Sequence, residues 1–209
     1  MIVDPMEKTS KKQLFARARG VIQSEAQALC DFQKQLPGTL VEVAQAVLGC
    51  KGHVLVAGAG TCWAVAERFA HLLACCGTPA LFINAANAIH GGAGSVTRKD
   101  IVYVISKGGQ TAELNEFVRI AKGNGAKIIA QTERLDSQLA RLSDLVYQVV
   151  APEGVDPYGM IATGSSLLNA AACDVLCVLL LELRGYTKEQ FGRTHPGGAV
   201  GQKLRRSSR

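Results

Sequence analysis

Short apolar runs alternate with longer segments of helical periodicity along most of the chain. The apolar runs predict five buried strands, at residues 54–57, 80–83, 101–105, 126–130 and 145–149. The segments between and after them predict helices, at about residues 61–76, 111–122, 137–142 and 163–184. Short strands that alternate with helices are typical of a parallel sheet with helices on both faces. The sequence therefore predicts an α/β fold built on one such sheet.

The chain carries a helical segment ahead of its first strand. Residues 8–48 show helical spacing, for example at Leu14, Ala18 and Val21, with a break at Pro37. Because this arm precedes the sheet, we expect it to pack on the outside of the domain or on another subunit. The predicted organisation is a helical arm over 1–50, a main domain over 51–204 and a basic tail over 205–209.

The third predicted strand ends in Ser106-Lys107-Gly108-Gly109-Gln110-Thr111 and leads directly into a helix. Free backbone N–H groups at such a turn, with the positive end of the helix dipole, form an anion site. The hydroxyls of Ser106 and Thr111 add two donors and Lys107 adds a charge. The turn therefore predicts binding of a small phosphorylated molecule. The alternative is an ordinary turn that needs glycine for its backbone angles.

A second glycine turn, Gly58-Ala59-Gly60-Thr61-Cys62, follows the first strand. It differs from a dinucleotide-binding fingerprint because Trp63 stands at the third glycine. No acidic residue ends the second strand to hold a ribose, since Asn84 and Ala85 stand there. NAD is therefore not expected, and no cofactor is predicted. Both turns lie at carboxyl ends of strands, where open α/β sheets bind ligands.

Two histidines lie in glycine-rich segments, His90 before Gly91-Gly92 and His195 before Pro196-Gly197-Gly198. Each is either part of a surface loop or a general acid/base, because imidazole titrates near neutral pH. Glu113, near the start of the helix after the 106–111 turn, either caps that helix or acts as a base close to the substrate. These groups could also hold a metal, but their spacing matches no known metal motif.

Two further groups of polar residues stand near the last long helix. Glu153 and Asp156 flank a loop, and the helix opens with Thr163, Ser165 and Ser166. Hydroxyls and free N–H groups at a helix start offer a second polar surface to a ligand.

Composition and charge exclude several classes of protein. The chain is 48% hydrophobic and 5% aromatic, and its net charge of +6 lies largely near the two ends. It lacks a basic helix and a DNA-binding motif, so nucleic-acid binding is not expected. The seven cysteines form no CxxC pair, and residues 1–13 lack the apolar core of a signal peptide. Residues 175–183 are too short to span a membrane. We expect a cytoplasmic protein that does not enter a membrane.

Over residues 54–204 the chain resembles the SIS (sugar isomerase) domain family, and within it the arabinose-5-phosphate isomerase branch. The segments that carry the resemblance are residues 194–201 (THPGGAVG), 88–91 (AIHG), 106–113 and 184–191. The resemblance implies a five-stranded parallel sheet flanked by helices, in the three-layer arrangement of flavodoxin-like proteins. It also implies binding of a phosphorylated sugar and aldose–ketose interconversion.

The resemblance also implies roles for individual residues. It places Glu113 and His195 at acid/base positions, and His195 is expected to reach the site of a neighbouring subunit in a homodimer or homotetramer. Counting places the second glutamate of the branch on Gly154, next to Glu153, which we take as the third catalytic candidate. His90 matches a histidine that sometimes meets a metal, although a metal-free mechanism is expected. The implied substrate-binding residues are Gly60, Thr61, Cys62, His90, Ser106, Lys107, Gly108, Gly109, Gln110, Thr111, Thr163, Ser165 and Ser166.

Two departures from the branch bear on catalysis. The branch usually has Gly-Lys-Ser after the first strand, where this chain has Gly60-Thr61-Cys62, so a lysine is missing. Its phosphate loop usually reads Ser-Asn-Ser-Gly-Glu-Thr, so Gly108 replaces a serine and Lys107 supplies a charge. The printed sequence ends at Arg209, so the nucleotide-sensing CBS modules of many members are not expected. The hypotheses are an isomerase, favoured by Glu113 and His195, and a non-catalytic phosphosugar sensor.

Overall fold

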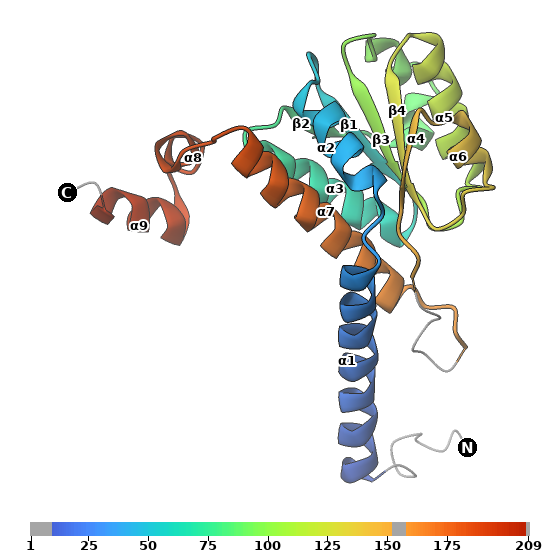
Figure 1. The fold of residues 1–209 in the computed structure, drawn as a ribbon, viewed down its shortest axis with the longest axis vertical. Coiled ribbons are helices and arrows are strands. Elements are labelled where there is room, and N and C mark those ends of the chain that lie inside the picture. The colour runs from blue at the N-terminus through green and yellow to red at the C-terminus, as the bar shows by residue number, and fades with distance from the viewer. Residues whose placement is uncertain (1–9, 152–157, 208–209) are drawn as a thin grey trace, which may run out of the picture.

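Five parallel strands form the sheet at the centre of the computed structural model, which describes residues 10–151 and 158–207. The strand order is β2-β1-β3-β4-β5 (Figure 1). The bounds are β1 Val54–Gly58, β2 Ala80–Phe82, β3 Ile101–Ile105, β4 Lys127–Thr132 and β5 Leu145–Gln148. The predicted fold class is confirmed. The one notable boundary difference is that β4 continues for two residues beyond its predicted end, because Gln131 and Thr132 are polar but buried and paired.

Helices cover both faces of the sheet. The described helices are α1 Lys11–Lys34, α2 Thr39–Leu48, α3 Thr61–Cys75, α4 Ala85–Ala88, η2 Gly92–Ser95, α5 Ala112–Gly123, α6 Gln138–Leu142, α7 Thr163–Leu183, α8 Lys188–Thr194 and α9 Gly198–Ser207. One hydrophobic cluster joins the sheet to α2, α3 and α7, and a second joins its other face to α4, η2, α5 and α6. The short helices α4, η2, α8 and α9 were not predicted.

The core helix α7 is long and apolar enough to span a membrane by length and composition. Nine of its residues, including Leu168, Ala172 and Leu176, are buried in the structure. Its buried side packs within the cluster that also holds Phe69 and Tyr103, whose ring centroids lie 5.0 Å apart. This is the burial expected of a core helix in a globular domain.

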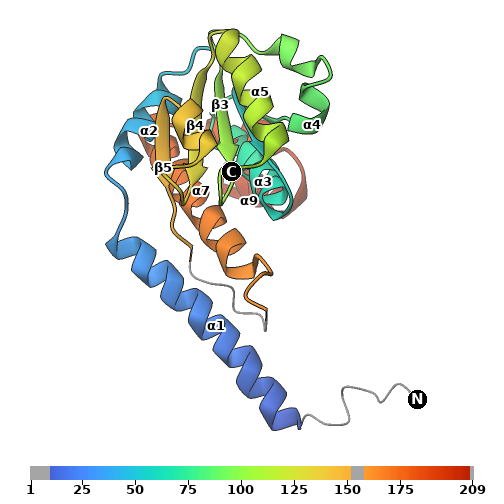
Figure 2. The ribbon, with the colours of Figure 1, turned by 90° about the vertical axis from the view of Figure 1, so that its right-hand side faces the viewer.

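The two N-terminal helices behave differently. The helix α2 contributes Leu40, Val43, Ala44 and Val47 to the core, whereas α1 has no buried residue. The C-terminal half of α1 touches the domain, for example where the Phe32 ring lies 6.5 Å from that of Tyr147. The rest of α1 extends away from the domain (Figures 1 and 2). The N-terminal segment is thus one core helix and one projecting helix.

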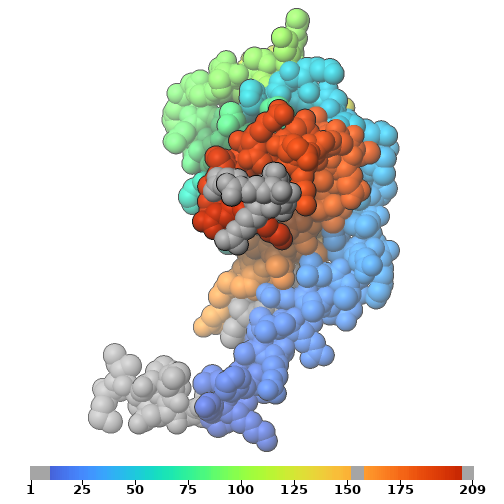
Figure 3. Space-filling view, turned by 90° about the vertical axis from the view of Figure 1, so that its left-hand side faces the viewer, coloured from blue at the N-terminus to red at the C-terminus, as the bar shows by residue number. Residues whose placement is uncertain are grey.

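The C-terminal helices α8 and α9 lie beyond the end of α7 (Figure 1) and appear, with part of α7, in the middle of the face that Figure 3 shows. The turn before them is anchored at the end of α3, where the Arg184 guanidinium donates to the Thr78 hydroxyl at 2.9 Å. Gly77 is required there, because a Cβ at this position would lie 2.5 Å from the Tyr186 ring. This anchor fixes where the segment leaves the domain.

Candidate functional site

The two predicted glycine turns lie side by side at the carboxyl edge of the sheet. The last residue of β1, Gly58, is paired with the last residue of β3, Ile105. In the strand order 2-1-3-4-5, the neighbours β1 and β3 mark the switch point at which ligands bind in such sheets. The fold therefore places both turns where a ligand site is expected.

The 106–111 turn is held closed by its own hydrogen bonds. The Ser106 hydroxyl accepts the backbone N–H of Gly109 at 3.2 Å and lies 3.4 Å from the Thr111 hydroxyl. Gly109 has φ +62°, and a Cβ there would lie 2.2 Å from the Ser137 hydroxyl oxygen. No other residue fits at position 109 without a shift of the turn.

The β4 side of the sheet supports this turn through its carbonyl groups. The Lys107 carbonyl accepts the Thr132 hydroxyl at 2.9 Å and the Glu133 N–H at 3.1 Å. The Gly109 carbonyl accepts the N–H of Leu139 at 3.0 Å and the side-chain amide of Asn115 at 3.4 Å. With its carbonyls bound to β4, α6 and α5, the turn is a rigid element.

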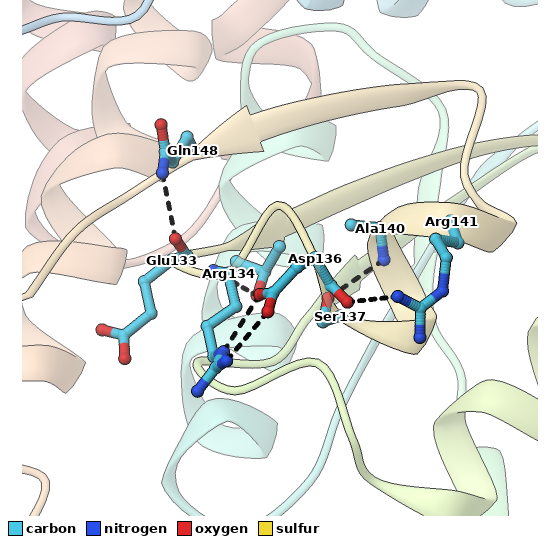
Figure 4. A network of polar contacts seen from close by, with 8 residues as sticks. Glu133, Arg134, Asp136, Ser137, Ala140, Arg141 and Gln148 are labelled. Atoms are coloured by element: carbon cyan, nitrogen blue, oxygen red, sulfur yellow. Dashed lines mark hydrogen bonds and ion pairs between the residues drawn. The ribbon is translucent and has the colours of Figure 1, made fainter.

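The segment that holds the Lys107 carbonyl is itself braced (Figure 4). Gln148 on β5 donates its side-chain amide to the Glu133 carbonyl at 3.0 Å. Arg134 forms a bidentate pair with Asp136, with distances of 3.2 and 3.0 Å. The ion pair is exposed and adds little stability alone, but it fixes the shape of the loop after β4.

The start of α5 presents donors that the protein leaves open. No side chain caps this helix, since the Thr111 hydroxyl makes no hydrogen bond to its first N–H groups. The Lys107 side chain is exposed and takes part in none of the ion pairs of the described residues. Unpaired N–H groups, a helix dipole and a free ammonium are the features of a phosphate site.

A cavity of about 370 Å³ lies next to the turn. The cavity is lined by the carboxyl ends of β1 and β2 and by the first turns of α3, α4 and α5. The lining residues are Gly58, Ala59, Gly60, Trp63, Asn84, Ala85, Ala86, Thr111, Glu113 and Leu114. The structure thus brings the predicted residues Gly60, Thr111 and Glu113 together in one wall. The sequence analysis did not assign Trp63 or Asn84 to the binding site, although both follow the carboxyl end of a strand.

Thr61 and Cys62 stand where the isomerase branch has its Lys-Ser pair, and Cys62 lies against the turn. Thr61 is exposed, and Cys62 is half-buried beside Lys107. Burial raises the pKa of the Cys62 thiol, and the backbone N–H and ammonium of Lys107 only partly oppose that shift. Cys62 is therefore a neutral thiol at physiological pH and does not replace the charge of a lysine.

The start of α7 is joined to the turn through a buried chain of hydrogen bonds. The Gln131 carbonyl accepts the Ser106 N–H at 3.0 Å, and the Gln131 amide donates to the Asn169 side chain at 2.7 Å. Asn169 in turn donates to the Ser165 carbonyl at 2.8 Å. This chain fixes the predicted Thr163–Ser166 segment relative to the turn, although these residues do not line the cavity.

The predicted histidines lie outside the cavity in this chain. His90 follows α4 and is exposed. His195 follows α8, where its ring stacks on Phe191 at 3.8 Å and its Nε2 lies 3.3 Å from the Cys75 sulfur. Its Nδ1 lies 2.9 Å from the Phe191 carbonyl oxygen, which can only accept, so Nδ1 is the donor of that bond.

The place of His195 relative to the cavity follows from α3. Cys75 ends this helix, and Thr61 begins it beside the cavity. Fourteen steps along a helix span roughly 21 Å, so His195 does not reach the cavity of its own chain. Glu153, the other predicted acid/base residue, lies outside the described residues.

Comparison with protein families and curated proteins identifies relatives over most of the chain. Residues 47–179 match the SIS domain model. The arabinose 5-phosphate isomerase KpsF of Escherichia coli is 33% identical over 202 residues, which are 96% of this chain and 62% of KpsF. The arabinose 5-phosphate isomerase KdsD of Escherichia coli K12 is 32% identical over 88% of this chain and 56% of KdsD. The chain thus spans about three fifths of the length of these relatives.

Solved structures match over nearly the whole described fold. A crystal structure from Listeria monocytogenes, with the provisional description of a sugar-phosphate isomerase, is 33% identical with a TM-score of 0.87. An Escherichia coli CFT073 protein in complex with A5P is 26% identical, also with a TM-score of 0.87. Both matches cover 90% of this chain and 100% of the matched one.

Proposed function

The chain belongs to the SIS domain family, and from that membership and the geometry of the cavity we propose that it is an aldose–ketose isomerase of sugar phosphates. Arabinose 5-phosphate is the first substrate to consider, because the relatives KpsF and KdsD are named for it. The observation that carries the proposal is the place of Glu113, a carboxylate in the wall of a cavity that borders a phosphate-type turn.

The turn holds the phosphate in this proposal. Its free N–H groups, the start of α5, the hydroxyls of Ser106 and Thr111 and the ammonium of Lys107 all favour a dianion. The sugar then extends from Thr111 towards Glu113 in the cavity. The remaining predicted binding residues, including His90 and the Thr163–Ser166 segment, do not line the cavity. In this proposal they contact the part of the substrate that extends beyond it.

Glu113 is the proposed base. In the open-chain aldose it removes the proton from C2 and returns it to C1, through an enediol(ate) intermediate. A positioned carboxylate contributes about a hundred- to ten-thousand-fold to such a transfer. Glu153 and His195 are the further acid/base groups of the proposal, and they exchange protons with the sugar hydroxyls.

His195 is proposed to act in the site of a second subunit of a homodimer or homotetramer. Its distance from the cavity of its own chain supports this arrangement. The projecting α1 supports it too, since Leu14, Phe15 and Ile22 are 45–67% exposed. Apolar side chains exposed along one helix favour association. We also propose a cytoplasmic location, which the seven free thiols favour.

A sensor that binds sugar phosphates without converting them is the second candidate. The observation that favours it is the pair Thr61 and Cys62, which supplies no charge where the isomerase branch has a lysine. Turnover and binding have to be measured separately to distinguish the two.

The test is incubation with a panel of aldose and ketose phosphates in D2O, followed by NMR, with thermal shift as the measure of binding. An isomerase forms the partner sugar and introduces deuterium at C1 or C2, and Glu113→Gln abolishes both. Stabilisation without exchange favours the sensor. If no sugar phosphate stabilises the protein, both functions are contradicted.

A further inference from the structure

The cavity contains an aromatic residue that the isomerase proposal does not use. We propose that Trp63 is the sugar-contacting platform of this site, and that it packs against the C–H face of a monosaccharide phosphate. This inference rests on the proposed function, because it assumes that the phosphate is held at the 106–111 turn.

The backbone fixes where the indole lies. Trp63 is in the first turn of α3, and its N–H donates to the Gly60 carbonyl at 3.0 Å. The turn before it is tight, since a Cβ on Gly58 would lie 2.3 Å from the Cys62 carbonyl oxygen. The indole packs against the ring of Phe82 on β2, with ring centroids 6.1 Å apart and an angle of 54° between the ring planes. Trp63 is therefore held from two sides in the cavity wall.

Trp63 is the large aromatic residue of this wall, and 46% of it remains exposed. The same wall carries the Glu113 carboxylate, the Thr111 hydroxyl and the Asn84 amide. Ligand sites commonly combine an aromatic surface with a few placed polar groups. A sugar has both counterparts, a face of C–H groups for the ring and hydroxyls for the polar side chains.

The dimensions of the cavity narrow the class of ligand. Small-molecule sites run from about 300 to 1,000 Å³, so about 370 Å³ is at the small end. This volume suits one monosaccharide unit. The indole N–H makes no hydrogen bond within the described residues, so it is also free to donate to a sugar hydroxyl.

The chain allows a direct readout, because Trp63 is its single tryptophan. Titration with arabinose 5-phosphate, followed by tryptophan emission, reports contact at this residue without any need for turnover. The expected result is a saturable change in emission, with inorganic phosphate alone producing much less. The change persists in Glu113→Gln, which keeps both the turn and the indole.

Kinetics of variants provide the second readout. Removal of an aromatic contact of about 1.4 kcal/mol raises KM about tenfold in Trp63→Ala. Trp63→Phe, which keeps a smaller ring, raises it less. The matched control is Leu81→Ala, which removes a 56% exposed apolar side chain on the same strand as Phe82 but outside the cavity wall.

The outcomes separate this inference from the proposed function. Turnover without any change in emission overturns the platform and leaves the isomerase standing. A change in emission without turnover supports the platform in a binding protein. If no sugar phosphate causes turnover or a change in emission, both the platform and the proposed function are overturned. If Trp63→Ala unfolds at a much lower temperature than the wild type, the KM of Trp63→Phe and the emission titration of the wild type still test the platform.

Discussion

The 106–111 turn and the C-terminal segment that carries His195 differ in how completely one chain builds them. The turn is bonded to β4, α5 and α6 through its carbonyls, and no side chain caps the N–H groups at the start of α5. In the C-terminal segment, both nitrogens of His195 are engaged by Cys75 and the Phe191 carbonyl of its own chain. One chain therefore completes the 106–111 turn by itself, whereas the proposed catalytic role of His195 requires the site of a second chain.

The largest effect is expected from the acid/base groups. Glu113→Gln keeps the shape of the side chain but removes the base, so kcat falls about a hundred- to ten-thousand-fold. Because the turn is untouched, the thermal shift caused by sugar phosphates stays near the wild-type value. A matching loss of binding would contradict the assignment of phosphate binding to the turn and of proton transfer to Glu113.

The next effect is expected at the turn itself. Gly109→Ala introduces a Cβ at φ +62° that collides with Ser137, so the turn has to move. Strain of about 1–3 kcal/mol corresponds to a loss in binding of roughly five- to 150-fold. Calorimetric titration with arabinose 5-phosphate measures it. Gly108→Ala is the control, because a Cβ at Gly108 meets no atom within 4 Å and its φ is ordinary.

A smaller effect is expected at the buried bridge between the turn and α7. Gln131→Met removes the acceptor of the Tyr103 hydroxyl, which lies at 2.7 Å, and the donor to Asn169. Each group left unsatisfied costs about 1–3 kcal/mol of unfolding free energy. Urea unfolding measures this loss. Tyr103→Phe removes only one of these bonds, so it should cost clearly less, and an equal cost would argue against the bridge.

The smallest effect is expected at Lys107. Its ammonium is exposed, so Lys107→Met should raise KM only about threefold, and added salt should reduce the difference. Lys127→Met is the matched control, since Lys127 is an exposed lysine at the opposite, amino end of β4. A salt-independent change would mean that Lys107 acts by packing and not by charge.

The sequence predicted the parts of this fold that depend on local pattern. Apolar runs revealed all five strands, and the glycines after β1 and β3 marked the edge at which the cavity lies. The place of Trp63 in the cavity wall was missed, because it depends on Phe82 and Glu113, which lie 19 and 50 positions away in the sequence. The position of His195 was equally beyond local pattern, since a contact between α8 and the end of α3 follows from packing alone.

The most direct test of the two-chain site is to mix Glu113→Gln and His195→Ala subunits, each inactive by itself. In a shared site, hybrids pair Glu113 of one chain with His195 of the other. Random exchange into twofold-symmetric pairs then restores about a quarter of the wild-type activity. The account predicts this recovery once mass spectrometry has verified subunit exchange. Complete exchange with no recovery would contradict it, because it would mean that Glu113 and His195 act within one chain.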